Sequence, residues 1–263
     1  MKSNFKIIVC VFFVMYGFNS CKKDTTPLPD MGYNYFPNDV GRYVVYDVDS
    51  LVYNDANLNP NTHLAPVDTF RFQIKEKITS VFSDNLNRPT LRLERFVKIY
   101  SDTLSYNQMP WKFRNVWTEN RTTSTAEKVE ENVRYIKLAF PVKENQTWNG
   151  NAQNYNQEMN YYYAFYDQRI KVGGVFYDSA LQVIQYDDGG GIFTERQLYT
   201  EKYARNVGMI YKQEINVFSQ PFAGWNNLTY GSDSVITFFA KPLMQRITGG
   251  TQCTMTINTY GVE

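Results

Sequence analysis

The stretch YYYAFYDQRIKVGGVFYDSALQVIQY, residues 161–186, indicates how this chain folds. Two runs rich in tyrosine, phenylalanine and valine flank the pair Gly173-Gly174. Aromatic and β-branched residues favour strands, and a glycine pair between two such runs is typical of a tight β-hairpin. The stretch therefore predicts two neighbouring antiparallel strands.

The same kind of pattern recurs along the body of the chain. Apolar and polar residues alternate strictly over 69–75 and with one slip over 90–100, and β-forming residues dominate 42–53. Alternation with a period of two is typical of a strand with one buried face. We expect roughly ten to twelve strands, joined mostly by short turns. Shorter strands are expected at 111–113, 134–140 and 216–218.

These features predict an all-β, mainly antiparallel fold with little helix, whose curved sheet forms a half-barrel or a β-sandwich. A sheet of that many strands has to curl or split into two. A parallel α/β fold would need long helical crossovers between its strands, and the sequence shows few. No repeat, low-complexity tract or shift of composition divides residues 31–263, so we expect one β-rich domain there.

Three segments depart from the strand pattern. Over 125–132, apolar residues at three- and four-residue steps follow a capping-box signature, which predicts a short helix or turn. Prolines mark a loop at 54–66. Gly249-Gly250 is interpreted as a second glycine turn between strands.

The beginning of the chain has the features of a secretory signal. Two lysines and an apolar run from Ile7 to Phe18 precede small and polar residues that end at Cys21. The run is too short to cross a bilayer, which takes about 20 apolar residues. We expect residues 1–20 to be removed. Residues 21–30 are polar, with two prolines, and read as a flexible tether.

Charge and cysteine content exclude several function classes. Of the 27 basic residues, Lys2 and Lys6 lie in the leader, which leaves 25 against 26 acidic residues. A chain this close to neutral has no electrostatic means of holding nucleic acid. After loss of Cys10 and acylation of Cys21, only Cys253 remains, so no disulfide can form within the chain. Cys253 alternates with polar neighbours and is expected to face the core with Met255 and Ile257.

The cysteine that follows Ser20 resembles the lipobox of bacterial lipoproteins. This resemblance implies that Cys21 is acylated and that the mature protein is anchored to a membrane by lipid, as two or more acyl chains anchor stably. Lys22-Lys23-Asp24 also resembles, with one acid, the export signal of surface lipoproteins in Bacteroidota. The implied location is the outer membrane, with the cell surface favoured over the periplasmic face.

Three patches of the body resemble outer-membrane lipoproteins of Bacteroidota. Residues 33–53 are similar to an opening "YFPL-x-x-G-x-x-W-x-Y" run, although Arg42-Tyr43-Val44 stands where the tryptophan is usual. Residues 137–150 are similar to such proteins as well, and 201–211 resemble the "YAxGVGLVK" segment of TapB-like and related half-barrel proteins. The resemblance implies a half-barrel fold and carries no catalytic residues.

A short pattern of aspartate, hydroxyl and aliphatic residue occurs four times. It resembles the O-glycosylation sequon of exported Bacteroidota proteins, and the alternative is that such pairs simply open strands at turns. The candidate acceptors are Ser50, Thr103, Ser179 and Ser234.

No catalytic, metal or cofactor site stands out. His63, the one histidine, lies in the 54–66 loop, and no Gly-x-Ser-x-Gly elbow supplies a nucleophilic serine. With His63 and Cys253 as the only soft ligands, a zinc site is not expected. A glycan hydrolase would need two carboxylates facing one sugar, and spacing selects no pair among Asp47, Asp49, Glu94 and Glu158. We therefore expect that the protein is not an enzyme and that it binds no cofactor.

The densest aromatic patch is the run from Tyr161 to Tyr166. Alternation places Tyr161, Tyr163 and Phe165 on one face of a strand. On an outer face these rings could stack on a ligand, whereas on an inner face they belong to the core.

Together these observations favour a non-catalytic envelope lipoprotein that binds or scaffolds, with a lipid or other apolar ligand in the half-barrel. The alternatives are a surface glycan-binding protein, a carboxylate-based glycan hydrolase and a purely structural surface protein. The expected partners are the membrane, through Cys21, and a lipid, a glycan or an envelope protein.

Overall fold

The computed structural model describes residues 29–190, 193–220 and 233–263. The predicted leader, the expected acylation site Cys21 and the predicted tether up to residue 28 lie outside the described residues. Residues 31–263 form one compact unit, separate from residues 1–30.

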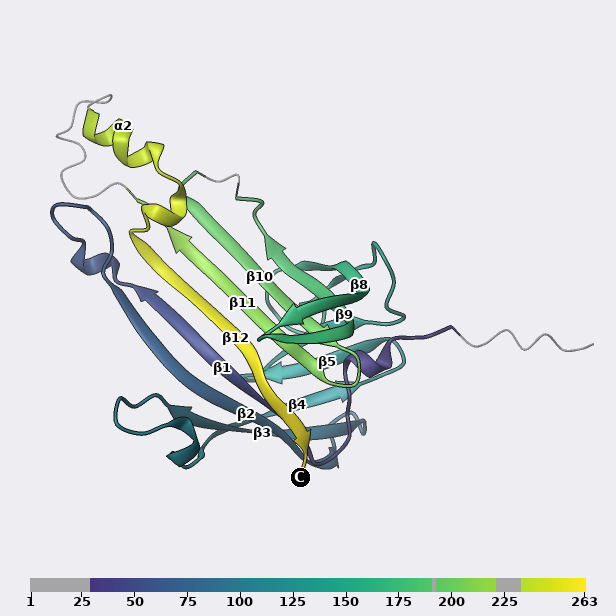
Figure 1. Cartoon of the computed structure of the whole chain (residues 1–263). Helices are drawn as coiled ribbons and strands as arrows, with labels where there is room; N and C mark the ends of the chain where they lie inside the picture. Colours follow the sequence, from purple (N-terminus) through teal and green to yellow (C-terminus); the bar gives the residue numbers. More distant parts are fainter. Residues whose placement is uncertain (1–28, 191–192, 221–232) are drawn as a thin grey trace, which may run out of the picture. The chain divides into compact units, whose positions relative to one another are not determined.

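In the described part of the chain, twelve antiparallel strands make up a single sheet. The first six are β1 (Arg42–Tyr53), β2 (Val67–Ser83), β3 (Pro89–Ile99), β4 (Lys112–Arg121), β5 (Thr125–Glu130) and β6 (Val133–Ala139). The other six are β7 (Thr147–Asn149), β8 (Asn160–Val172), β9 (Val175–Asp187), β10 (Glu195–Ala204), β11 (Gly208–Phe218) and β12 (Gly249–Val262). The strand order is β6-β5-β4-β3-β2-β1-β12-β11-β10-β9-β8-β7. The first and last strands therefore pair at the centre of the sheet, and Figure 1 shows β1 beside β12.

The sheet curls until its two edge strands meet. Ile136 N in β6 donates to Gly150 O just after β7 at 2.9 Å, and Trp148 Nε1 donates back to Ile136 O at 2.9 Å. The Tyr163 hydroxyl on β8 bonds both Ala139 N at 3.0 Å and Ala139 O at 2.7 Å. The result is a nearly closed, barrel-like sheet, which confirms the predicted all-β fold. We call the meeting of β6 and β7 the seam.

Helix is a minor part of the unit. Among the residues that the structure describes, the helices are α2 (Asp233–Ala240) and the one-turn segments η1 (Tyr33–Tyr35), η2 (Asp55–Asn57), η3 (Tyr106–Gln108) and η5 (Leu243–Gln245). Within the described ranges, none of them has the length and apolarity to cross a membrane.

The helix or turn expected at 125–132 is wrong, because most of this segment is strand β5. It pairs with β4 on one side and β6 on the other. Glu131 and Asn132, both at positive φ (48° and 68°), form the tight turn to β6. Hydrogen bonding to two neighbouring strands outweighs a helical spacing that is only two turns long.

The two glycine pairs behave differently. Gly173-Gly174 forms the predicted hairpin turn, with φ of 56° and 84°. Gly249-Gly250 is not a turn, because both residues begin β12. Gly250 has φ of 114°, and a Cβ there would lie 2.2 Å from Asn216 O on β11. Glycine is required at this position by a close approach of backbone, not by a change of chain direction.

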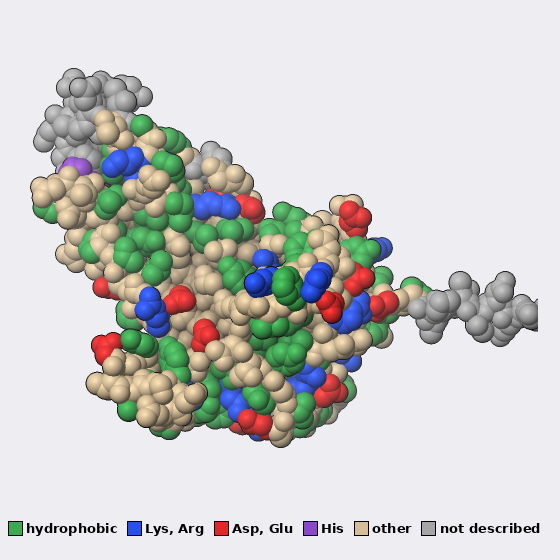
Figure 2. All heavy atoms as spheres, viewed as in Figure 1, with side chains coloured by type: hydrophobic (Ala, Val, Ile, Leu, Met, Phe, Trp, Pro, Cys, Tyr) green, Lys and Arg blue, Asp and Glu red, His purple; other side chains and the backbone are tan. Residues whose placement is uncertain are grey.

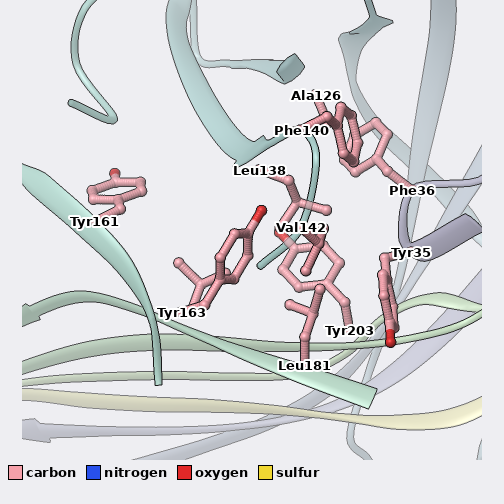
Figure 3. Packing of buried hydrophobic residues seen from close by; sticks show 11 residues of the cluster. Tyr35, Phe36, Ala126, Leu138, Phe140, Val142, Tyr161, Tyr163, Leu181 and Tyr203 are labelled. Atoms are coloured by element: carbon pink, nitrogen blue, oxygen red, sulfur yellow. The ribbon is translucent and has the colours of Figure 1, made fainter. Parts of the chain in front are cut away.

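Two larger hydrophobic clusters pack the unit. One gathers aromatic residues from η1, β8 and β10 around Leu138, and Figure 3 shows the Tyr163 ring directed toward Leu138 and Val142. The other includes Met255 and Ile257, with Cys253 packed partly buried against it. The predicted common face of these three β12 residues is confirmed.

Candidate functional site

Charged side chains line the inner face of the curved sheet and pair with one another there. Lys137 Nζ in β6 lies 2.7 Å from Glu201 Oε1 in β10, although these strands are far apart in the sheet order. Such a pair can form only across the inside of the sheet. The interior charge network has four acidic and four basic side chains, each at most 16% exposed: Glu76, Arg95, Glu119, Lys128, Glu130, Lys137, Glu201 and Lys212.

One half of the network is centred on Glu76 in β2. Its carboxylate accepts from Arg95 Nε at 2.9 Å and from Lys128 Nζ at 2.8 Å. Lys128 also lies 3.2 Å from Glu119. The Arg95 guanidinium sits 3.4 Å from the centre of the Trp117 ring, whose face attracts the cation.

The other half is centred on Glu201 in β10. Lys137 bridges Glu201 and Glu130, at 2.7 Å and 2.9 Å. The Tyr203 hydroxyl donates to the second Glu201 oxygen at 2.5 Å. Lys212 lies 3.9 Å from Glu201 and 2.8 Å from Glu214. Each buried lysine therefore lies close to a carboxylate, which offsets the cost of burying its charge in a medium of low dielectric constant.

Pairing decides the protonation of most of these groups. Burial raises the pKa of Glu76, but the charges of Lys128 and Arg95 outweigh it and leave that pKa below its usual value. Burial is likewise outweighed at Glu130 and Glu201, where Lys137 and Lys212 lower the pKa. At Glu119 burial prevails over Lys128 and the pKa is raised. Three of the four interior carboxyls are therefore held ionised.

Acid is expected to weaken the fold through these three carboxyls. Because their pKa in the folded chain lies below the ordinary value of 4.5, their contribution to stability is complete above that pH and is lost as pH falls below it. Urea unfolding should show a lower free energy of unfolding at about pH 3 than at pH 7. In the variant Glu76→Gln, the free energy of unfolding should fall less between pH 7 and pH 3 than in the wild type. An equally large fall in the variant would contradict the role assigned to Glu76.

Two hollows flank the network. A small cavity of about 80 Å³ is lined by all eight side chains of the network, together with apolar residues such as Trp117 and Met255. A larger cleft of about 580 Å³ opens beside its Lys137 half. This second volume is within the range of small-molecule sites. We call it the seam cleft, since β6 and the segment following β7 both line it: Glu130, Tyr135, Lys137, Asn151, Asn156, Gln157, Met159, Tyr161, Gln185, Tyr199, Lys212 and Glu214.

The loop between β7 and β8 forms one wall of the seam cleft. Hydrogen bonds of asparagine side chains hold this loop in place. Asn149 Oδ1 accepts from the backbone N–H groups of Asn151 and Met159, at 2.9 Å and 3.2 Å. Asn151 Nδ2 donates to Gln157 O at 2.6 Å. Asn154 Nδ2 donates across the seam to Arg134 O at 2.7 Å. The wall is therefore preformed, which keeps the ordering cost of binding low.

Gln185, on β9, lines the seam cleft with an unsatisfied amide. The residue is 6% exposed, and its Nε2 has no hydrogen-bond partner in the described part of the chain. Buried amide donors nearly always have an acceptor. An unpaired one in a cleft wall is therefore a feature that a ligand acceptor would complete.

The tyrosine row expected at 161–165 is largely core. Tyr161 and Tyr163 are each 3% exposed, within the first hydrophobic cluster, and Phe165 is partly buried. Only Tyr161 lines the seam cleft. Burial raises the pKa of Tyr161 to about 12 and that of Tyr163 further. Neither ring offers a free face on the outer surface.

The four candidate glycosylation sites lie in different settings. Thr103 is exposed in the loop after β3, whereas Ser50 is partly buried in β1. The Ser179 hydroxyl is engaged by Tyr35, Asp167 and Arg205. Ser234 lies in α2, and its side chain is outside the described residues. Their modification stays a prediction.

The other residues considered from sequence remain outside the seam cleft. His63 lies in the predicted loop before β2, and Asp47 and Asp49 pair with Gln73 and Arg71 on the neighbouring strand. Within 29–190, 193–220 and 233–263, no group of His, Cys, Asp or Glu side chains could hold a metal ion. Basic and acidic side chains are interspersed on the face shown in Figure 2.

Sequence reasoning missed both the charge network and the seam cleft. Alternation can place charged residues on one face of a strand, but it does not say whether that face lies inside the folded sheet. The signal that was available is the number of charges that alternate with apolar residues on successive strands, as at Lys128 and Glu130.

No family model matches the chain, and no curated protein matches it. A crystal structure of a protein from Bacteroides fragilis, described as exported and as having a YMCC-like fold, aligns with a TM-score of 0.41. The alignment covers 86% of this chain and 98% of that one, at 7% sequence identity. Kinship with Bacteroidota outer-membrane lipoproteins stays a prediction.

Proposed function

We propose that this chain is a non-catalytic binding module of the cell envelope that captures a polar small ligand in the seam cleft. The observation that carries the proposal is the preformed cleft of about 580 Å³ with the unpaired Gln185 amide in its wall. The leader and Cys21 support export and anchoring by acyl groups at the outer membrane. Lys22-Lys23-Asp24 supports display at the cell surface.

A polar ligand fits this site better than the lipid that the half-barrel resemblance suggested. An acyl chain inside the sheet would lie against Lys137, Glu201 and the other charges of the interior network, and it could satisfy none of them. The cavity that the network lines holds only about 80 Å³. Amide and tyrosine side chains line the larger seam cleft and can both donate and accept hydrogen bonds.

The same charges argue for binding without catalysis. Glycoside hydrolysis needs one carboxylic acid with a raised pKa to protonate the leaving group. Lysines lower the pKa of Glu130, in the cleft wall, and of Glu201 beside it, so both are ionised at neutral pH. Glu119, whose pKa is raised, lines the cavity of about 80 Å³ together with Glu130 and Glu201, and it does not line the seam cleft.

Native mass spectrometry of the full-length chain, purified in mild detergent from bacterial membranes, tests the proposal. We expect an added mass that survives organic extraction of lipids and is lost on extensive dialysis. The variant Gln157→Trp, which puts a bulky ring into the cleft wall, should lose the added mass. Asn107→Trp, on the exposed η3 turn, is the matched control and should keep it. An added mass that organic solvent removes and Gln157→Trp leaves in place would overturn the proposal in favour of a lipid.

A further inference from the structure

We infer that the ligand of the seam cleft is an uncharged saccharide that stacks on Tyr155 and accepts a hydrogen bond from Gln185. The inference rests on the proposed function and names the ligand class of the same site. Three independent features carry it: an exposed ring on the loop that lines the cleft, a buried donor in the cleft wall and the balance of charge around the cleft.

Tyr155 is the most exposed aromatic residue of the described chain. Its side chain is fully exposed at 108% of the reference area. It directly precedes Asn156 and Gln157, which line the seam cleft. The loop that carries it is held by Asn154, which bonds Arg134 O on β6 and, through Oδ1, the backbone N–H of Asn156 at 2.8 Å. A ring that finds no packing partner yet stands on a braced loop is suited to stack on a ligand.

Gln185 supplies directional recognition inside the cleft. Its Nε2 is a donor without an acceptor, so the matching ligand atom is an oxygen. A saccharide hydroxyl or ring oxygen accepts such a bond. Its other hydroxyls both donate and accept, as do the Asn156 and Gln157 amides and the Tyr135 and Tyr199 hydroxyls in the same walls.

Charge around the cleft favours a neutral ligand over an ionic one. Lys137 is held between Glu130 and Glu201, and Lys212 lies 2.8 Å from Glu214. Each lysine that lines the cleft therefore already pairs with a carboxylate, and each carboxylate that lines the cleft already pairs with a lysine. An anionic or cationic ligand would have to displace one of these partners and leave a buried charge unpaired.

Calorimetric titration of the full-length chain tests the inference, with neutral oligosaccharides, uronic-acid oligosaccharides and short peptides as probes. We expect binding of a neutral oligosaccharide. Tyr155→Ala and Gln185→Met should each weaken it by roughly tenfold or more. Tyr155→Phe should bind as the wild type does, because stacking needs the ring and not the hydroxyl. Tyr166→Ala, which removes a half-exposed tyrosine on β8, is the control and should leave the affinity unchanged.

The other possible outcomes distinguish the proposed function, binding of a polar ligand in the seam cleft, from the inference that this ligand is a neutral saccharide. Preference for an acidic saccharide or a peptide, with loss in Gln157→Trp, would overturn the saccharide inference and leave the proposed function standing. Neutral saccharide binding that neither Tyr155→Ala nor Gln185→Met weakens would overturn the assignment of these two residues. Absence of binding by every probe, together with no dialysable mass on the purified chain, would overturn both claims.

Discussion

Replacing Glu201 with glutamine is expected to lower the free energy of unfolding by roughly 3 kcal/mol. Glu201 is 1% exposed and joins β10 to Lys137 on β6 and to the Tyr203 hydroxyl. The neutral amide keeps the shape of the side chain but removes the charge that compensates two buried lysines. Lys137 and Lys212 retain Glu130 and Glu214, which is why the expected loss lies at the lower end for a broken buried pair.

Denaturant unfolding, followed by tryptophan fluorescence, measures this loss directly. Glu214→Gln is the matched control, because Glu214 also pairs with Lys212 but its side chain is 43% exposed. We expect the control to lose less than about 1 kcal/mol. A Glu201→Gln variant as stable as the control would show that the network does not hold the two ends of the sheet together.

The second large effect is expected from Gly250→Ala, which should destabilise the fold by about 3 kcal/mol or more. The added Cβ would lie 2.2 Å from Asn216 O and 2.7 Å from Val217 Cα, both on β11. Neither is the movable end of a side chain, so relief requires β12 to shift away from β11. The φ of 114° adds strain, because residues with a Cβ rarely adopt it.

Thermal or urea unfolding of Gly250→Ala and Gly189→Ala separates the two causes. Gly189 also has a positive φ, 69°, but a Cβ there would meet nothing within 4 Å. We expect Gly189→Ala to cost about 1–2 kcal/mol, the price of a left-handed conformation alone. Equal losses in the two variants would mean that the β11–β12 approach is not tight.

Local patterns predicted much of the secondary structure because alternation is a property of one strand. Residues 69–75 alternate and lie in β2, residues 90–100 alternate and all but the last lie in β3, and Gly173-Gly174 turns between β8 and β9 as expected. The same local logic failed at 125–130, where pairing with β4 and β6 overrode a helical spacing. It failed again at Gly249-Gly250, where the requirement for glycine comes from a neighbouring strand.

The candidate site was not predictable in the same way. Tyr155 and Gln185 are unremarkable in the sequence, and only their contrasting burial singles them out. Tyr161 and Tyr163 stand out in the sequence but are packed in the core. Side-chain type alone does not say whether a strand face is enclosed, so the sequence left open whether the Tyr161–Tyr166 run lies in the core or on the surface.

By itself, the sequence determined the β class and the near-neutral charge, because composition and short-range periodicity suffice for these, whereas the export leader stays a prediction. Only the tertiary structure decided that β12 enters between β1 and β11, that β6 meets β7 at the seam, and that Lys137 reaches Glu201. These pairings join residues up to 64 positions apart in the charge network. Their partners are chosen by strand register and sheet curvature, which arise only when all twelve strands are in place.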